Sequence, residues 1–580
     1  PPPPPHFFFQ AEDGKRDPLW SRGLGDVYKR QGLESTSNWL WGFPLLYLLI
    51  GGGIYFSIYS RFAPFFYLCH SIQILRGKYN NPNDPGQINH FQALCSALSG
   101  TVGMGNITGV AVAIIQGGPG ALFWMWVCAL LGMATKFFTC SLAVMYRGKD
   151  QTGQVQGGPM YFITEGLGNK WKPLAMAFCF FGLFGCLPMF QSNQLTAIVS
   201  EMFFIPNDWF VDSSKNVTPI GQGLFGILLA ILVGSVIFGG IQRIGKVAAS
   251  LVPFMVILYG SCALIIIIMH LDQIPKAFLL IITDAFTGQA VTGGILGTVI
   301  STGVRRAAFS NEAGMGTEAM AHGAAKTKEP IREGLVAMLG PMIDTIIVCT
   351  ITGLVIINTG VWEKGVTIDR ISKLKNSIEQ YATEKNISSV NQNDLIELTI
   401  TNKELNNKKI YIEPFNRLDA WGQPIRINSE INRKDDKFIL VSSGPDKVLN
   451  THDDLTSEVS PSSYSGVMLT EKAYRMISPK IGPFLLLVSV LCFSFSSMIG
   501  FSYYVTKCGI FLFGIKARIP LILFYLAGIV ISAIVDLKYL IYFLDIMFGL
   551  MAVPTILSTI ILSPHVMERA RAYFLNLKET

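Results

Sequence analysis

The sequence predicts an all-α polytopic membrane protein whose helices form two repeats of opposite orientation. Half of the 580 residues are hydrophobic, 12% are aromatic and only 15% are charged, which excludes an ordinary soluble domain. Apolar runs of about 20 residues recur along the chain, and each is long enough to cross a bilayer as a helix. Two of these runs contain clustered glycines, which a continuous lipid-facing helix would avoid. We therefore expect membrane helices that are interrupted inside the bilayer.

Eleven transmembrane helices are expected, and the basic residues between them set the orientation. Lys and Arg follow the odd-numbered spans, as Arg305 and Arg306 do after the seventh, whereas the other short loops hold few. Because basic loops stay in the cytoplasm, we expect the N-terminus outside and the C-terminus inside. The spans lie at residues 39–60, 88–116, 118–146, 174–204, 220–240, 246–270, 277–304, 333–358, 481–507, 519–536 and 539–562.

The second span is expected to unwind between Ser99 and Asn106, where three glycines interrupt the apolar sequence. At such a break, the N–H groups that begin the second half-helix attract an anion, and the C=O groups that end the first half attract a cation. This pair of sites suits a zwitterion that travels with a metal cation. The alternative interpretation is that the glycines only allow neighbouring helices to pack closely.

A second interruption is expected in the seventh span, at Gly293, Gly294 and Gly297. When the first span is left out, spans two to six and seven to eleven form two five-helix repeats, which have opposite orientation because five is odd. The two interrupted spans each open a repeat, as in membrane proteins built from inverted repeats. This coincidence favours interrupted helices over close packing.

The chain divides into five segments. Residues 1–31 begin with five prolines and lack the pattern of a signal peptide, so we interpret them as a non-native leader outside the fold. The membrane core occupies residues 39–358 and 480–565, and residues 566–580 form a cytoplasmic tail. Between the two parts of the core, residues 360–479 are polar, and the parity of the spans places this insert outside the cytoplasm.

The insert is expected to form a small extracytoplasmic α+β domain, because it contains β-type runs such as residues 438–441. Residues 419–424, 442–446 and 450–454 resemble the C-terminal part of type II secretion major pseudopilins. This resemblance implies a Ca²⁺ site in the acidic loop. A solvated acidic turn is the alternative, because Ca²⁺ needs several convergent oxygen ligands. The sequence does not indicate which partner the insert binds.

Composition and motifs also exclude other classes of protein. The ten cysteines lie in or beside apolar segments and form no CxxC pair, which argues against a disulfide framework or a structural zinc site. The net charge of +7 is spread over loops, so we expect the lipid bilayer and no nucleic acid as a partner. The sequence shows no P-loop, metal-ligand cluster or nucleophile triad, and we expect no enzymatic activity.

Several motifs carry a resemblance to a known family. The run GGPGALFWMWVCALLG at residues 117–132 and the stretches at residues 157–161 and 309–316 resemble the alanine or glycine:cation symporter family. The resemblance implies the five-plus-five fold of leucine-transporter-like proteins. It also implies sodium- or proton-coupled uptake of a small neutral amino acid, alanine or glycine, across the bacterial cytoplasmic (inner) membrane.

The same resemblance implies a substrate site at the unwound part of the second span, where backbone N–H groups would bind the substrate carboxylate. Family members commonly carry Ala where Thr108 stands and Trp where Phe501 stands. These two departures are expected to change the shape of the pocket and thus the choice of substrate. The residues expected to bind substrate are Gly103, Met104, Gly105, Thr108, Gln191 and Phe501.

A sodium site is implied between spans two and nine, because relatives of this fold hold a sodium ion between the corresponding core helices. The expected ligands are the carbonyls of Ser99, Val102 and Phe493 and the hydroxyls of Ser496 and Ser497. Adjacent serines in a membrane helix have another interpretation, because their hydroxyls can bond to the preceding turn. Paired with the glycine break, they favour sodium.

Two polar residues inside spans leave alternatives open. Asn106 is expected either to bind a cation or to cap the second half-helix. Asp344 lies in the eighth span, where a carboxylate without a partner is costly, so a functional role is the default interpretation. It is a candidate for a second cation or proton site, or for the counter-charge of a substrate ammonium group.

The favoured hypothesis is sodium-coupled symport by alternating access, which requires that each ligand bind one conformation better than the other. Two other functions stay open. One is a membrane amino-acid sensor, in which the insert is the receptor module and the core binds without transport. The other is a proton-coupled symporter of the same fold.

Overall fold

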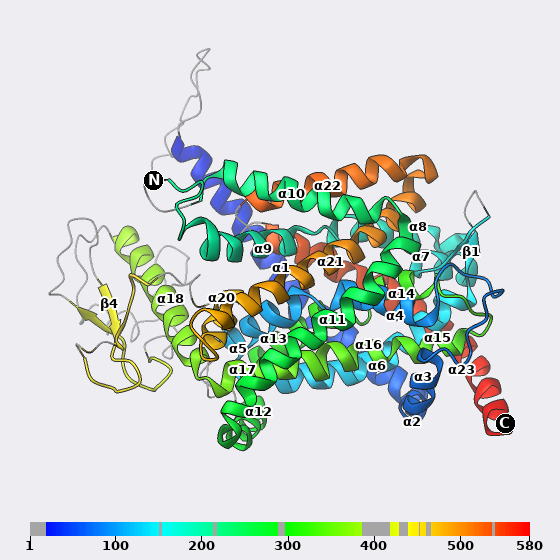
Figure 1. Cartoon of the computed structure of the whole chain (residues 1–580), viewed down its shortest axis with the longest axis horizontal. Coiled ribbons are helices and arrows are strands. Elements are labelled where there is room, and N and C mark those ends of the chain that lie inside the picture. The colour runs from blue at the N-terminus through cyan, green and yellow to red at the C-terminus, as the bar shows by residue number, and fades with distance from the viewer. Residues whose placement is uncertain are drawn as a thin grey trace, which may run out of the picture.

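The structure is a computed structural model, and it is a bundle of helices with one small α+β lobe at one end (Figure 1). The start of α1 (Leu19–Tyr59) lies near this lobe, and the C-terminal end of α23 (Leu540–Glu579) lies at the opposite end of the bundle. The structure describes residues 19–149, 153–212, 217–287, 296–385, 418–428, 439–449, 451, 453–459, 464, 466–535 and 540–579.

Within the described residues, nine helices are long and apolar enough to cross a membrane, or ten if one bent pair counts as a span. They correspond to every expected span except the seventh, so the expected number of eleven is not confirmed. Besides α1 and α23, the spans are built from α6 (Ala121–Met145), α8 (Lys172–Gly185), α9 (Met189–Val199), α10 (Pro219–Ile237), α11 (Gly240–Met269), α15 (Pro330–Ala337), α16 (Leu339–Pro341), η6 (Met342–Cys349), α17 (Thr350–Asn358), α21 (Ile481–Phe513) and α22 (Arg518–Ile534).

Short segments connect these spans and cover their ends. Several are single turns, and one is a two-stranded antiparallel hairpin made by β1 and β2. The segments are α2 (Ala63–Phe66), α3 (Leu68–Leu75), β1 (Gly148–Lys149), β2 (Val155–Gln156), α7 (Pro159–Tyr161), η2 (Phe162–Gly166), η3 (Asn169–Trp171), η4 (Ser200–Phe204), η5 (Leu271–Gln273) and η9 (Ile515–Ala517).

The second expected span is interrupted where the sequence predicts. α4 (His90–Thr101) begins with a capping box at Asn89 and ends before Val102, whose backbone is extended. The chain resumes as the π-helical turn η1 (Gly105–Gly109) and then as α5 (Val110–Gly117). The second half-helix is bent by 52° from α4. Such a break leaves helix-end N–H and C=O groups without partners in their own helix.

In the seventh expected span, residues 277–304, the described residues form α12 (Ile274–Thr287) and α13 (Leu296–Asn311). Gly297 is the second residue of α13 as described. The other two glycines of the predicted interruption fall outside the described residues.

The interruption that the structure shows lies further along the chain, after α13. The backbone has positive φ at Glu312 (56°), Gly314 (88°) and Gly316 (84°), a conformation that favours glycine. The helix then resumes as α14 (Thr317–His322). These residues are buried in the bundle, so the fold has a second broken segment, at a position that the sequence analysis did not predict.

Two arginines explain why the sequence analysis missed this second broken segment. The sequence assigns Arg305 and Arg306 to a cytoplasmic loop, because charged residues lower the mean hydropathy and end an apolar run. In the structure both lie within α13. Neither arginine therefore supports the predicted orientation of the chain, and the basic residues that follow this segment are Lys326, Lys328 and Arg332.

The described part of the insert combines a helix with a sheet. α18 (Val361–Lys385) packs against a three-stranded antiparallel sheet of order β3-β4-β5, and α20 (Gly466–Tyr474) leads back to α21. The strands are β3 (Arg426–Asn428), β4 (Ile439–Ser442) and β5 (Leu455–Thr456). The lobe has its own small apolar core, formed by Ile368, Ile371, Leu374, Ile378, Ile425, Leu440 and Leu455. The pseudopilin resemblance is not shown, and the extracytoplasmic location stays a prediction.

The acidic loop of the insert is held by its own hydrogen bonds. The Asp453 carboxylate accepts from the Thr451 hydroxyl at 2.7 Å and from the Asp446 N–H at 3.2 Å. The Thr451 hydrogen bond lowers the pKa of Asp453. In the part of the chain that the structure describes, no three His, Cys, Asp or Glu side chains gather as a metal site would require. The predicted Ca²⁺ site therefore has no support.

The insert is also packed directly onto the broken second span. α18 contacts α5, and α20 contacts η1. Gly365 of α18 lies against Ile115 of α5 and Leu469 of α20. Gly466, which has a φ of 57°, lies at the start of α20 against Thr108 of η1. The lobe and the second half-helix therefore share one packed interface.

Candidate functional site

A cavity of about 580 Å³ lies beside the break in the second span. Its walls come from both sides of this break and from α1, α8, α9, α13, α21 and α23. All six residues that the sequence predicts to bind substrate line the cavity, namely Gly103, Met104, Gly105, Thr108, Gln191 and Phe501. The fold thus brings together residues from three separate spans around one space.

Two polar side chains of the cavity have unsatisfied atoms. Thr108 Oγ1 and Gln191 Oε1 are buried, and neither has a hydrogen-bond partner among the described residues. Buried polar atoms in proteins are nearly always hydrogen-bonded, so these two require a polar group from a ligand or water. Phe190, Phe309 and Phe501 supply apolar surface in the same cavity. The lining therefore suits a small ligand that has both polar and apolar parts.

The side-chain ligands of the predicted sodium site lie where α21 passes the break. A Cβ atom on Gly103 would lie 3.8 Å from the Phe493 carbonyl and would collide with the Ser497 hydroxyl. The hydroxyls of Ser496 and Ser497 are buried, and nothing in the described part of the chain hydrogen-bonds to them. In contrast, Ser489 of the same helix donates to a carbonyl one turn earlier at 2.9 Å. The alternative of bonding to the preceding turn is therefore not observed for the two candidate serines.

The break also frees two backbone carbonyls. In a continuous helix the Ser99 carbonyl would accept from the Gly103 N–H, but this N–H donates to Asn106 Oδ1 at 2.7 Å. The Val102 carbonyl likewise loses the Asn106 N–H, which donates to the Gly103 carbonyl at 3.1 Å. Hard cations bind oxygen ligands, and helix-end carbonyls at a break are such ligands. The five predicted ligands therefore fit Na⁺ by their chemistry.

Asn106 and Asp344 form a buried hydrogen-bonded pair beside the cavity. Asn106 Nδ2 donates to Asp344 Oδ1 at 2.7 Å, and its Oδ1 accepts the Gly103 N–H, which is a capping contact. The hydroxyls of Ser310 and Thr345 donate to Asp344 Oδ2 at 2.8 and 2.7 Å. Asp344 is not among the residues that line the cavity. Its carboxylate therefore fixes the break to α13 and η6 through three neutral donors.

Sequence reasoning missed a charged pair at the far end of the cavity. Arg305 of α13 forms an ion pair with Asp545 of α23 and donates to the Ser37 hydroxyl at 3.0 Å. Arg306 also lines the cavity, 3.5 Å from the side-chain oxygen of Gln116. The signal that could have found these groups is the presence of ionisable residues within apolar spans, where they are rare and mark functional positions.

Known proteins resemble this chain over most of its length. A relative from Haemophilus influenzae, described as an uncharacterized transporter, is 34% identical over 554 residues, which cover 94% of this chain and 96% of that protein. The sodium/alanine symporter AgcS of Methanococcus maripaludis is 42% identical over 333 residues, which cover 57% of this chain and 70% of that protein. The crystal structure of MhsT in complex with L-phenylalanine matches with a TM-score of 0.47 and 12% identity, over 82% of this chain and 88% of that chain.

A family model covers both parts of the membrane core. The model described as the sodium:alanine symporter family matches residues 26–401 and 440–580. Residues 402–439, which it leaves out, fall within the insert. The match covers far more than half of the sequence and includes all the residues that line the cavity. The chain therefore belongs to the sodium:alanine symporter family.

Proposed function

We propose that the protein is a sodium-coupled symporter that carries a small neutral amino acid, alanine or glycine, across the bacterial cytoplasmic membrane by alternating access. Membership in the sodium:alanine symporter family supports cation-coupled symport of an amino acid. The name of the Methanococcus maripaludis relative, a sodium/alanine symporter, supports the choice of ion and substrate. The observation that carries the proposal is the cavity at the broken helix, where buried oxygens without partners meet the backbone of the break.

The substrate carboxylate is assigned to the N–H groups at the start of the second half-helix, near Met104 and Gly105. Partial positive charge gathers at such a helix end, which favours an anion. Gln191 and Thr108 supply polar contacts, and Phe501 supplies apolar contact for a short side chain.

The sodium ion is assigned to the carbonyls of Ser99, Val102 and Phe493 with the hydroxyls of Ser496 and Ser497. A cation at this site would neutralise the partial negative charge at the end of α4. The α4 and α21 segments contact each other beside the break, so the ion would join them next to the substrate. Occupation of either site therefore stabilises the packing that the other site needs, which is the basis of coupling.

We further propose the leucine-transporter-like arrangement of two inverted five-helix repeats. Two broken segments, one after α4 and one after α13, support it, and they lie close together because Gly105 packs against Ser310 of α13. The lobe and the start of α1 lie at one end of the bundle, opposite the end of α23 (Figure 1). This supports the predicted topology, with the N-terminus and insert outside and the C-terminus inside.

Uptake of radiolabelled alanine and glycine into proteoliposomes, with sodium and pH gradients imposed separately, tests the proposed function. We expect accumulation against a concentration gradient only when sodium is higher outside. Accumulation driven by the pH gradient alone would instead establish the proton-coupled alternative. Binding without accumulation would favour the amino-acid sensor, which the direct packing of α18 and α20 on α5 and η1 makes the second candidate.

Replacing Ser497 with alanine is expected to raise the half-saturating sodium concentration for alanine binding by roughly 10- to 100-fold. A hydrogen-bonding group that contacts a charge contributes about 1.5–3 kcal/mol, and about 1.4 kcal/mol corresponds to a tenfold change. Equilibrium binding of labelled alanine at graded sodium concentrations measures the effect. Ser489→Ala removes a hydroxyl that already bonds within α21, so this control should bind as the wild type does. An unchanged sodium dependence in Ser497→Ala would remove this residue from the site.

A further inference from the structure

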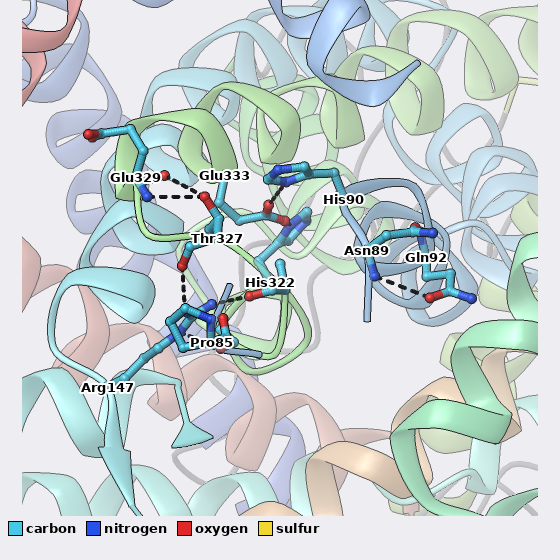
Figure 2. Close-up of polar contacts among 11 residues, drawn as sticks. Pro85, Asn89, His90, Gln92, Arg147, His322, Thr327, Glu329 and Glu333 are labelled. Carbon is cyan, nitrogen blue, oxygen red and sulfur yellow. Dashed lines mark hydrogen bonds and ion pairs between the residues drawn. The ribbon is translucent and has the colours of Figure 1, made fainter. Parts of the chain in front are cut away.

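A buried carboxylate joins two imidazoles at the end of the bundle opposite the insert (Figure 2). His322 Nδ1 lies 2.6 Å from Glu333 Oε1, and His90 Nδ1 is hydrogen-bonded to Glu333 Oε2. All three side chains are buried. We refer to His90, His322 and Glu333 as the triad.

The triad connects the two broken segments. His90 is the first residue of α4, which leads into the first break. His322 is the last residue of α14, which follows the second break, and Glu333 lies in the first turn of α15. The three side chains therefore hold together the half-helices that lie on this side of both breaks.

Backbone contacts close the same end of the bundle. The chain before α4 and the chain after α14 are joined by hydrogen bonds between residues 87–88 and 324–326. Arg147 fastens the same loops by donating to the carbonyls of Pro85, Gly323, Ala325 and Thr327. Opening of this end of the bundle therefore requires the triad and these loops to separate together.

With Glu333 ionised and both imidazoles neutral, the triad carries one net negative charge. Burial lowers the pKa of Arg147 to about 10, while the charge of Glu333 acts in the opposite direction, so Arg147 stays protonated at neutral pH. The other charged or titratable groups on the segments packed around the triad include His70, Lys136, Cys140, Arg243, Lys246, Glu312, Glu318, Glu329, Arg332, Lys507, His565, Glu568, Arg569, Arg571 and Tyr573.

We propose that the triad is a proton-binding site that closes this end of the bundle. Arg147 directs its hydrogen bonds to four backbone carbonyls, so the three side chains keep a negative charge of their own. One added proton makes the triad itself neutral, and burial favours this form because a net charge is costly away from water. His90 Nε2 is buried, and no residue that the structure describes hydrogen-bonds to it, so it can accept that proton. When this end opens, water solvates the three side chains and the preference for the neutral form disappears. The proton is therefore held in the closed state and released on opening.

This inference rests on the alternating access proposed above, but not on the identity of the substrate or the coupling ion. Because the closed state binds more protons, acid favours the closed state and alkali favours the open state. A difference of one bound proton changes the ratio of closed to open molecules by up to about tenfold per pH unit.

Hydrogen exchange of the full chain in lipid nanodiscs, without substrate, tests the proposal. Exchange in residues 90–101 and 317–322 is measured from about pH 6 to about pH 8, the range in which histidine titrates, with labelling times scaled to cancel the intrinsic pH dependence of amide exchange. We expect exchange in both segments to rise with pH in the wild type. Glu333→Gln keeps the shape of the side chain without its charge, so this variant should lose the pH dependence.

Glu329→Gln is the matched control, because this carboxylate lies near the start of the same helix and pairs with Arg569 at the surface. It should keep the pH dependence of the wild type. Wild-type exchange that does not change with pH overturns the proposal, and so does a pH dependence in Glu333→Gln equal to that of the wild type. If Glu333→Gln does not fold, the double variant His90→Asn with His322→Asn replaces it, because asparagine keeps a donor but does not titrate. Uptake assays on the same proteins separate the two proposals: pH-dependent exchange without uptake in the wild type would contradict only the proposed function.

Discussion

Replacing Gly103 with alanine is expected to reduce sodium-dependent alanine uptake by about 100-fold. The added Cβ would collide with the Ser497 hydroxyl and would lie 3.8 Å from the Phe493 carbonyl, inside the candidate sodium site. Overpacking of a tight site costs roughly 1–3 kcal/mol, and about 1.4 kcal/mol corresponds to a tenfold loss of affinity. Initial rates of uptake into proteoliposomes, compared at equal amounts of inserted protein, measure the loss.

Gly260→Ala is the matched control for this prediction. Gly260 lies in the membrane helix α11, does not line the cavity, and a Cβ built on it meets no atom of the described residues within 4 Å. Uptake by Gly260→Ala should stay close to that of the wild type. Equal losses in the two variants would show that uptake is sensitive to any added methyl group in a membrane helix. Normal uptake by Gly103→Ala would show that the close approach of the break to α21 is not needed for transport.

Replacing Asp344 with asparagine is expected to abolish uptake and to lower the thermal stability of the purified protein. The carboxylate accepts hydrogen bonds from Asn106, Ser310 and Thr345, and it is the group through which these donors hold the break. An asparagine has one acceptor oxygen and turns an N–H group toward at least one of the donors. Breaking a buried network at a charged group costs roughly 3–5 kcal/mol. Apparent melting temperature in detergent and uptake in proteoliposomes measure the two effects.

Ser310→Ala is the comparison variant for the Asp344 prediction. It removes one donor to Asp344 and leaves the bonds from Asn106 and Thr345 in place. A hydrogen bond to a charged group is worth about 1.5–3 kcal/mol, so Ser310→Ala should fold and transport with a smaller loss than Asp344→Asn. If Asp344→Asn were as mild as Ser310→Ala, the carboxylate would not be the anchor of the break.

Local sequence was sufficient to predict the first broken span, because three glycines and an asparagine stand within an apolar run. It failed for the second broken segment. Arg305 and Arg306 interrupt the apolar run before the break after α13, so hydropathy ended the span too early and assigned these half-buried arginines to a loop. The ion pair between Arg305 and Asp545 explains how such charges can be accommodated there, but the two residues are 240 positions apart and no local pattern connects them.

In the candidate site, too, some features could be predicted from the sequence and others could not. The six substrate positions and the sodium ligands came from motifs and from family resemblance, and the fold places the six around one cavity. The partners of Asp344 could not be predicted, since Asn106 lies 238 positions away in sequence and Ser310 lies 34 away. The triad was missed for the same reason: His90 and Glu333 are 243 positions apart. Hydrogen-bond partners between distant segments follow from packing, which the periodicity of single spans does not contain.

The packing of Gly365 against Ile115 and of Gly466 against Thr108 has a consequence for how the molecule can be controlled. A ligand or antibody fragment that restrained the β3-β4-β5 sheet would act through α18 and α20 on the wall of the cavity, without entering it. Such a molecule would act as a non-competitive inhibitor, because it would change turnover without occupying the cavity. The same contacts limit how the insert can be engineered: a module that replaced the sheet would have to cover the apolar face of α18, whereas α18 and α20 must stay because they pack on the broken span.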